Sequence, residues 1–214
     1  MAYKEISDFM PLFVNDKLLS KPGTQYDYSG TGFVILGLII EKVSGENYYD
    51  YIRHNILVPT KMINTTELEV DSIVTNKASG YTSKFGENKT LKKNDYYLSK
   101  ASPAGFYYST VHDLFNFSKA LRSHKLLKKE TTELMFTPKV KGYNTHLGYG
   151  IDIDQRHQQN IIGISGGWYG IHCELMDFVD SNYTIVILSN IDDGGKKGTS
   201  LVADFFKELI VGKK

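Results

Sequence analysis

Residues 22 to 45 read PGTQYDYSGTGFVILGLIIEKVSG, an apolar segment held between two turn signals. Pro22-Gly23 breaks the chain, because proline fixes its own backbone and glycine accepts conformations that other residues avoid. Residues 31 to 43 are strongly apolar and predict a helix, and the run from 33 to 40 predicts a buried one. Ser44-Gly45 ends it, since glycine suits the left-handed position past a helix end.

Further helices are predicted on both sides of this segment. The predicted spans are residues 5–19, 47–57, 110–122 and 129–136. Pro59 and Pro138 stop the second and the fourth of them. Thr110 resembles an N-cap, with Asp113 placed to complement the helix dipole. Residues 60 to 100 are polar and irregular, so we expect loops there with short strands at most.

The character of the chain changes after residue 145. Segments rich in β-branched and aromatic residues, separated by turn signals, predict strands at 149–154, 160–165, 172–180 and 183–189. The turn signals are Gly166-Gly167 and Asp180-Ser181-Asn182. Residues 199–211 predict a closing helix with one apolar side. Its apolar residues are Leu201, Val202, Phe205, Phe206, Leu209 and Ile210. Helices, then an antiparallel meander, then a helix on the sheet give an α+β fold.

Composition excludes several classes of partner. The net charge is +1, and 23% of residues are charged, so there is no electrostatic case for nucleic acid or an anionic membrane surface. The single cysteine, Cys173, rules out an internal disulfide and is expected to be a small core residue. The N-terminal residues mix charges with apolar residues, so no signal peptide is expected there.

Residues 22–32 resemble one signature of the β-lactamase-related family of penicillin-recognising serine hydrolases, in which Pro-Gly-Thr is followed by Tyr-Ser-Asn before an apolar helix. Other segments follow the family in the same order over roughly residues 20 to 190. These are Leu36-Gly37, 40–45, Tyr51-Ile52, Pro103-Ala104-Gly105, Ser109-Thr110, Asp113-Leu114, Gly148-Tyr149-Gly150, 163–170 and 186–190. One such motif would be weak evidence, but the series is strong.

The resemblance implies acyl transfer on a β-lactam, a peptidoglycan peptide or an ester. In the family a serine of a Ser-x-x-Lys motif attacks the carbonyl carbon. A tyrosine next to that serine helps to move its proton. A third motif, which begins with Lys or His on a sheet strand, and backbone N–H groups that form an oxyanion hole complete the site. No cofactor and no metal are implied, and members usually act outside the cytoplasmic membrane.

Each part can be placed on this chain. Tyr28 matches the motif tyrosine, and Gly30 stands where the family has the asparagine. The third motif aligns with Ile164-Ser165-Gly166-Gly167, so Ile164 replaces a cation or an imidazole. Gly167 would supply an oxyanion-hole amide, and Gly166 would let a substrate backbone pass close to the strand.

Ser-x-x-Lys does not occur in the sequence. In the family it lies upstream of the tyrosine motif, so the chain is expected to be the C-terminal two-thirds of such a hydrolase. The expected organisation is one partial domain over 1–214, mainly helical to about 145 and a sheet with a helix from 146 to 214. Without the serine no acyl-enzyme forms at this site. The strand at 183–189 would then have an unpaired edge and favour self-association.

Three interpretations stay open: a fragment of a hydrolase, a non-catalytic module that binds a peptidoglycan peptide or a partner protein, and half of a split enzyme. Losses at Gly30 and Ile164 favour the second, because truncation alone would not alter them. A Gly-x-Ser-x-Gly elbow at Ser165 is disfavoured, because a strand rather than a helix is expected after it. Asp152 and Asp154 share a strand face and are interpreted as an exposed edge.

Overall fold

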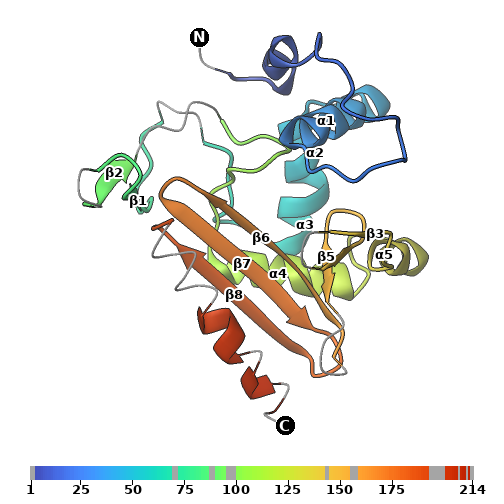
Figure 1. The fold of residues 1–214 in the computed structure, drawn as a ribbon, viewed down its shortest axis with the longest axis vertical. Helices are drawn as coiled ribbons and strands as arrows, with labels where there is room; N and C mark the ends of the chain where they lie inside the picture. Colours follow the sequence, from blue (N-terminus) through green and yellow to red (C-terminus); the bar gives the residue numbers. More distant parts are fainter. Residues whose placement is uncertain are drawn as a thin grey trace. The chain divides into compact units, whose positions relative to one another are not determined.

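A computed structural model describes residues 3–68, 72–86, 90–94, 100–142, 145–154, 159–192, 201–206, 208–210 and 212. The chain forms two compact units (Figure 1). Unit 1 comprises Met1–Thr75 and Tyr97–Asp113, and unit 2 comprises Asn76–Tyr96 and Leu114–Lys214. The single partial domain expected from the sequence stays a prediction, because a compact unit is not in itself an independent domain.

Unit 1 is built from helices. They are η1 (Ile6–Leu12), α1 (Gly30–Ser44), α2 (Tyr48–Ile52), η2 (Arg53–Leu57) and α3 (Val58–Thr60). The apolar helix predicted at 31–43 is confirmed as α1. The Ser29 hydroxyl caps its start by accepting the Gly32 N–H at 3.1 Å. Gly45 ends it in the left-handed conformation with φ 74°.

The buried position predicted for α1 is wrong. Of its residues only Val34 and Gly37 are buried, while Leu36 is 54% and Val43 is 81% exposed. Gly37 lies directly against Pro103: a Cβ at this glycine would lie 2.2 Å from Pro103 Cγ. Leu38 and Ile40 of the same helix pack against the cluster of Ile6, Tyr48 and Tyr49. The helix thus contacts the rest of unit 1 along one side, and several of its apolar side chains stay exposed.

Two other helix predictions need correction, both at prolines. The helix expected over 5–19 ends at Leu12, and Leu18 is 79% exposed. Pro11 has no N–H to donate, and the backbone leaves helical angles at Phe13. Pro59 was expected to stop the next helix, yet helix continues to Thr60. The preceding turn, η2, is a π-helix, which relieves the clash that Pro59 would otherwise make with the turn before it.

Tyrosines form the core of unit 1. Ile6, Tyr48 and Tyr49 are buried together, and the Tyr49 hydroxyl donates to the Ala101 carbonyl at 2.8 Å. Burial raises the pKa of Tyr48 to about 12. The Tyr48 hydroxyl therefore stays protonated well above neutral pH, as its apolar packing requires.

Unit 2 contains a six-stranded antiparallel sheet. Its strands, in spatial and sequence order, are β3 (Val140–Lys141), β4 (His146–Leu147), β5 (Asp152–Asp154), β6 (Ile161–Trp168), β7 (Ile171–Phe178) and β8 (Tyr183–Ser189). A separate pair, β1 (Gly80–Thr82) and β2 (Lys92–Asn94), forms a short hairpin. The α+β class and the meander predicted from the sequence are confirmed, and β3 and β4 are additional strands.

The turn predicted at Gly166-Gly167 is wrong. β6 runs through both glycines, and each pairs with a residue of β7. The chain turns at Tyr169 and Gly170, where Gly170 has φ +83°. Two-residue hairpin loops require such positive φ values, which glycine supplies at no steric cost. The turn expected before β8 is confirmed, and there Asn182 has φ 54°.

The two helices predicted between the loops and the sheet are confirmed as α4 (Val111–Arg122) and α5 (Lys129–Met135). At the start of α4 the Thr110 hydroxyl accepts the Asp113 N–H at 3.2 Å. The buried Asp113 carboxylate accepts from the Asn64 N–H and the Thr65 hydroxyl, both at 2.8 Å. Thr110 thus caps the helix, as its sequence position predicts.

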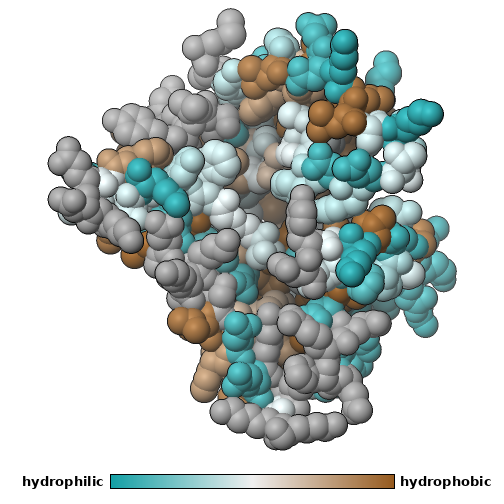
Figure 2. All heavy atoms as spheres, in the orientation of Figure 1, coloured by the Kyte–Doolittle hydropathy of each residue, from teal (hydrophilic) through white to brown (hydrophobic). Residues whose placement is uncertain are grey.

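The C-terminal helical segment, residues 201–206 and 208–210, packs on one face of the sheet. Ala203 is buried with Ile161, Met176 and Phe178, and Ile210 packs against them. The predicted apolar side is otherwise exposed: Phe205 by 61% and Leu209 by 64%. Figure 2 shows apolar residues at the surface over this segment, at the lower left. None of the described helices is both long and apolar enough to cross a membrane.

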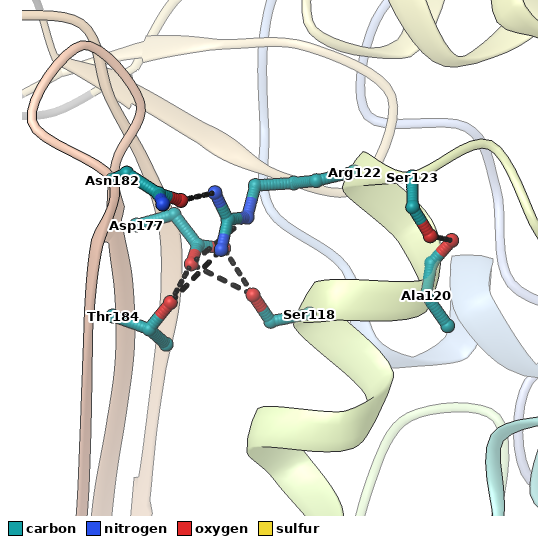
Figure 3. Close-up of polar contacts among 7 residues, drawn as sticks. All are labelled: Ser118, Ala120, Arg122, Ser123, Asp177, Asn182 and Thr184. Atoms are coloured by element: carbon teal, nitrogen blue, oxygen red, sulfur yellow. Dashed lines mark hydrogen bonds and ion pairs between the residues drawn. The ribbon is translucent and has the colours of Figure 1, made fainter.

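A buried ion pair fastens α4 to the opposite face of the sheet (Figure 3). The Asp177 carboxylate is 4% exposed and accepts hydrogen bonds from the hydroxyls of Ser118 at 2.7 Å and Thr184 at 2.6 Å. Arg122 Nε lies 3.3 Å from Asp177 Oδ1. Because both carboxylate oxygens have partners, the charge can stay inside the unit.

Candidate functional site

The predicted site residues fall into two groups. Tyr28 and Gly30 lie at the N-terminal end of α1, in unit 1. Ile164, Ser165, Gly166 and Gly167 are consecutive in β6, in unit 2. Each group has its own local geometry.

Tyr28 immediately precedes the helix cap. A turn at Pro22-Gly23 leads into it: Gly23 has φ +77°, and the Thr24 N–H donates to the Lys21 carbonyl at 3.2 Å. The Tyr28 side chain is 61% exposed, with its ring 6.0 Å from that of Phe33. The phenol is therefore accessible to a reacting partner, and the Phe33 ring lies on one side of it.

Gly30 is the first residue of α1, and the space around it is open. A Cβ built there would lie 3.8 Å from the Cβ of Ala104, an ordinary contact. Ala104 belongs to a tight turn in which the N–H groups of Ser102 and Gly105 donate to each other's carbonyls. A Cβ would therefore fit at position 30, so packing does not require a glycine there.

The backbone of β6 has one open edge in the segment that holds the third motif. β5 pairs with β6 only at Ile161, Ile162 and Gly163, and among the described residues no strand continues along that edge. The Val179 N–H donates to the Asn160 carbonyl at 2.9 Å, which makes that pair a hydrogen-bonded one. Hydrogen-bonded and non-hydrogen-bonded pairs alternate in an antiparallel ladder. The alternation turns the N–H and C=O groups of Ser165 and Gly167 away from β7 and toward the open edge.

Glycine is required at some positions of β6 and not at others. A Cβ at Gly163 would lie 2.4 Å from the Leu175 carbonyl oxygen, whereas a Cβ at Gly166 would meet only Cys173 Sγ at 3.4 Å. Gly167 is intermediate, at 3.0 Å from His172 Cδ2. Gly166 is thus free of close packing, as a position beside a ligand would be.

Three β7 residues lie opposite this segment and were not predicted as site residues. His172 pairs with Gly167, Cys173 with Gly166, and Glu174, which is 9% exposed, with Ser165. The expectation that Cys173 is a core residue is wrong, since the residue is exposed. Its sulfur is partly screened by neighbours, and this burial raises the pKa of the thiol. In the sequence, only the alternation of side chains along the strand predicted at 172–180 could have indicated these residues.

The hairpin loop that ends β6 is fixed by contacts with the β1–β2 hairpin. The Asn94 side-chain amide donates to the Tyr169 carbonyl at 2.7 Å, and the Gly170 backbone lies against Gly80 and Tyr81. The rings of Phe85 and Trp168 flank Tyr169, with centroid separations of 5.0 and 5.2 Å. These contacts position the end of the strand that carries Gly167.

Other candidate chemistries have little support. β6 continues into a β-hairpin, so Ser165 lies outside the strand–turn–helix context of a nucleophile elbow. Asp152 accepts the Thr145 hydroxyl, and partial burial raises the pKa of its carboxyl group. Among the described residues, no group of three His, Cys, Asp or Glu side chains is arranged to hold a metal ion.

Comparison with solved structures agrees with the fold. A penicillin-binding protein from Bacillus halodurans superposes with a TM-score of 0.86 at 26% identity, covering 94% of this chain and 63% of that one. An octameric penicillin-binding protein homologue from Pyrococcus abyssi gives 0.85 at 26% identity, covering 98% and 48%. Both are longer than this chain.

Sequence comparison gives the same relationship. Penicillin-binding protein 4* of Bacillus subtilis is 29% identical over 202 residues, which are 87% of this chain and 45% of the relative. Putative penicillin-binding protein PbpX of the same organism is 32% identical over 179 residues, 83% of this chain and 43% of the relative. The chain thus spans less than half the length of these relatives. The family model described as Beta-lactamase matches residues 2–203, and the chain therefore belongs to the β-lactamase and penicillin-binding-protein family of serine hydrolases.

Proposed function

We propose that these 214 residues supply part of an acyl-transfer site for a β-lactam, a peptidoglycan peptide or an ester, and that they do not turn over substrate on their own. The observation that carries this proposal is the absence of Ser-x-x-Lys from the sequence. Acyl transfer through an enzyme intermediate needs an activated nucleophile, and in the family that nucleophile is the serine of the absent motif.

The proposed roles follow the local geometry of each group. Tyr28, exposed beside the start of α1, assists proton transfer to and from a serine. The Gly167 N–H, directed at the open edge of β6, stabilises the oxyanion. Ser165 binds the substrate backbone along that edge, and Gly166 lets that backbone pass close to the strand. Gly30 and Ile164 line the site without contributing polar atoms.

A second candidate is a non-catalytic module that binds a peptidoglycan peptide or a partner protein. It is favoured by Ile164, which places an uncharged side chain, 51% exposed, where the family has a cation or an imidazole. It is also favoured by Gly30, which stands where the family has the asparagine although a Cβ would fit there without a clash. A packing requirement for glycine at position 30 therefore does not explain the loss of the asparagine amide. Half of a split enzyme, completed by a polypeptide that carries Ser-x-x-Lys, is the third.

The test of catalysis is nitrocefin hydrolysis together with labelling by a fluorescent penicillin, on the purified chain and on Tyr28→Phe. We expect neither turnover nor a covalent label in either protein. Turnover that Tyr28→Phe abolishes, with a label on a serine, would contradict the proposal, and Ser165→Ala would then be the first variant to examine.

Binding separates the candidates. A muropeptide titrated calorimetrically should bind without hydrolysis if the second candidate holds, and Gly166→Val should weaken that binding by placing a branched side chain on the strand. Leu36→Lys, an exposed substitution on α1, is the matched control. Activity that appears only after a polypeptide with Ser-x-x-Lys is added would favour the split enzyme.

A further inference from the structure

One face of β6 carries a row of apolar side chains that is interrupted at a glycine. Side chains alternate across a strand, so Ile164, Gly166 and Trp168 lie on the same face. The Cα atoms of Ile164 and Trp168 are about 13 Å apart, because each residue of a strand rises about 3.3 Å. Gly166 places no side chain between them. We call this gap, with the two side chains that flank it, the Gly166 notch.

The floor of the Gly166 notch can accept part of a ligand. A Cβ built on Gly166 would meet only the Cys173 sulfur, at 3.4 Å. The Gly167 N–H, which faces the open edge of β6, belongs to the peptide group that joins Gly166 to Gly167. A carbonyl oxygen that accepts a hydrogen bond from this N–H therefore brings its own substituent next to the notch. An aromatic ring fits there, since carbon atoms in contact need only about 3.5–4.0 Å on each side.

The β1–β2 hairpin supports the Trp168 side of the notch. The ring of Tyr169 lies between those of Trp168 and Phe85, with centroid separations of 5.2 and 5.0 Å. Asn94, which is 3% exposed, holds the Tyr169 carbonyl through its side-chain amide. Figure 1 shows the hairpin beside the turn that joins β6 and β7. A wall that is already fixed loses little conformational entropy when a ligand packs against it.

The chemistry of the Gly166 notch favours an aromatic group over a sugar. Its walls are the side chains of Ile164 and Trp168, which carry no charge, and aromatic rings pack favourably against an indole. A sugar ring needs hydrogen-bonding side chains beside the aromatic face. At this wall the amide of Asn94 already donates to the Tyr169 carbonyl.

We propose that the Gly166 notch binds an aromatic acyl group of the substrate, with Trp168 as the residue that determines this specificity. The carbonyl oxygen of the acyl group accepts from the Gly167 N–H, and the aromatic ring lies over Gly166 between Ile164 and Trp168. The preferred substrates are therefore esters or amides of arylacetic or similar acids. This inference rests on the proposed function, because it needs an acyl group bound along the open edge of β6.

The test uses the fluorescence of Trp168, which is the only tryptophan of the chain and so reports on this site alone. The purified chain is titrated with N-phenylacetylglycinamide and with N-acetylglycinamide, two uncharged compounds that differ only by the phenyl group. We expect the phenylacetyl compound to bind on the order of tenfold more tightly and to shift the Trp168 emission to shorter wavelength. N-acetylglucosamine is titrated in parallel as the sugar probe.

Two variants test the walls of the notch, with dissociation constants measured by calorimetry. Trp168→Ala and Ile164→Ser should each bring the ratio of the two dissociation constants toward one, and Ile164→Ser keeps the fluorescent reporter. Partial loss of the fold would weaken both compounds and leave their ratio unchanged. Phe205→Ala is the control, because Phe205 belongs to the same unit and is 61% exposed, as Phe85 is; it should keep the ratio of the unaltered chain.

The outcomes separate this inference from the proposed function. Equal binding of the two compounds, or binding of the phenylacetyl compound without a change in Trp168 emission, would overturn the inference and leave the proposed function standing. Binding of neither compound would contradict both. A response of Trp168 to N-acetylglucosamine at lower concentrations than to the phenylacetyl compound would assign the notch to a sugar and overturn the inference.

Discussion

Replacing Arg122 with methionine tests whether a buried charge holds α4 against the sheet. The variant keeps a long apolar stem and removes the cation next to Asp177, whose side chain is 5% exposed. Arg122 also donates to Asn182 and Thr184. Loss of one partner from a buried ion pair leaves the other charge uncompensated, which costs about 3–5 kcal/mol. Ser118→Ala removes one hydrogen bond to the carboxylate, which should cost about 1.5–3 kcal/mol.

The assay is urea unfolding followed by far-ultraviolet circular dichroism, with the free energy of unfolding extrapolated to water. Lys129→Met is the control, since it breaks an exposed pair with Glu133 in the same unit and should cost less than about 0.5 kcal/mol. If Arg122→Met cost no more than this control, the carboxylate would not depend on the arginine. The conclusion that the ion pair between Arg122 and Asp177 holds α4 against the sheet would then be wrong.

Two other substitutions test unit 1. Gly37→Ala should lower the melting temperature, because overpacking against Pro103 costs about 1–3 kcal/mol and exceeds the gain in helix propensity. Gly30→Ala is the control and should not lower it, because the space around Gly30 is open. Equal melting temperatures for the two variants would contradict the contact between Gly37 and Pro103. Stability should fall as the pH rises from 10 through 12, because the folded state keeps the Tyr48 proton, with its pKa of about 12, after the unfolded state has lost it. Tyr48 contributes roughly 2–3 kcal/mol of this loss, and burial also raises the pKa of Tyr107, which adds to it. In Tyr48→Phe the loss should therefore be smaller, and parallel pH profiles would exclude Tyr48 as a source.

Local signals in the sequence predicted elements better than they predicted burial. The caps of α1, Ser29 and Gly45, act through neighbouring residues, so a linear pattern is sufficient to find them. The burial of Gly37 in α1 depends on Pro103, which is distant in sequence. Gly166-Gly167 has the composition of a turn, but pairing with β7 keeps it extended. Tertiary contacts decided both outcomes, and no window of sequence contains them.

The candidate site shows the same division. Family motifs placed Tyr28 before a helix and Gly166 on a strand, and the structure has both there. The hydrogen bond between the backbones of Val179 and Asn160 shows which residue pairs of β6 and β7 are hydrogen-bonded. That pattern determines which amides of β6 face the open edge. Opposed residues such as His172 are likewise fixed only by pairing. The roles of the site residues stay predictions until binding or turnover is measured.

Every strand of the six-stranded sheet pairs with the strand that precedes or follows it in the chain. Each pairing therefore closes a short loop, for which the entropy cost is small, and local contacts of this kind favour rapid folding. We expect β6 and β7 to pair first, since a two-residue loop joins them, and β8 to add next. Unit 1 differs, because residues 76–96, which belong to unit 2, separate its two segments along the chain. The core of unit 1 includes the hydrogen bond from Tyr49 to Ala101, so it is complete only after the second segment of the unit has packed. During refolding, hydrogen-exchange labelling should therefore show protection of the six-stranded sheet before protection of the cluster of Ile6, Tyr48 and Tyr49.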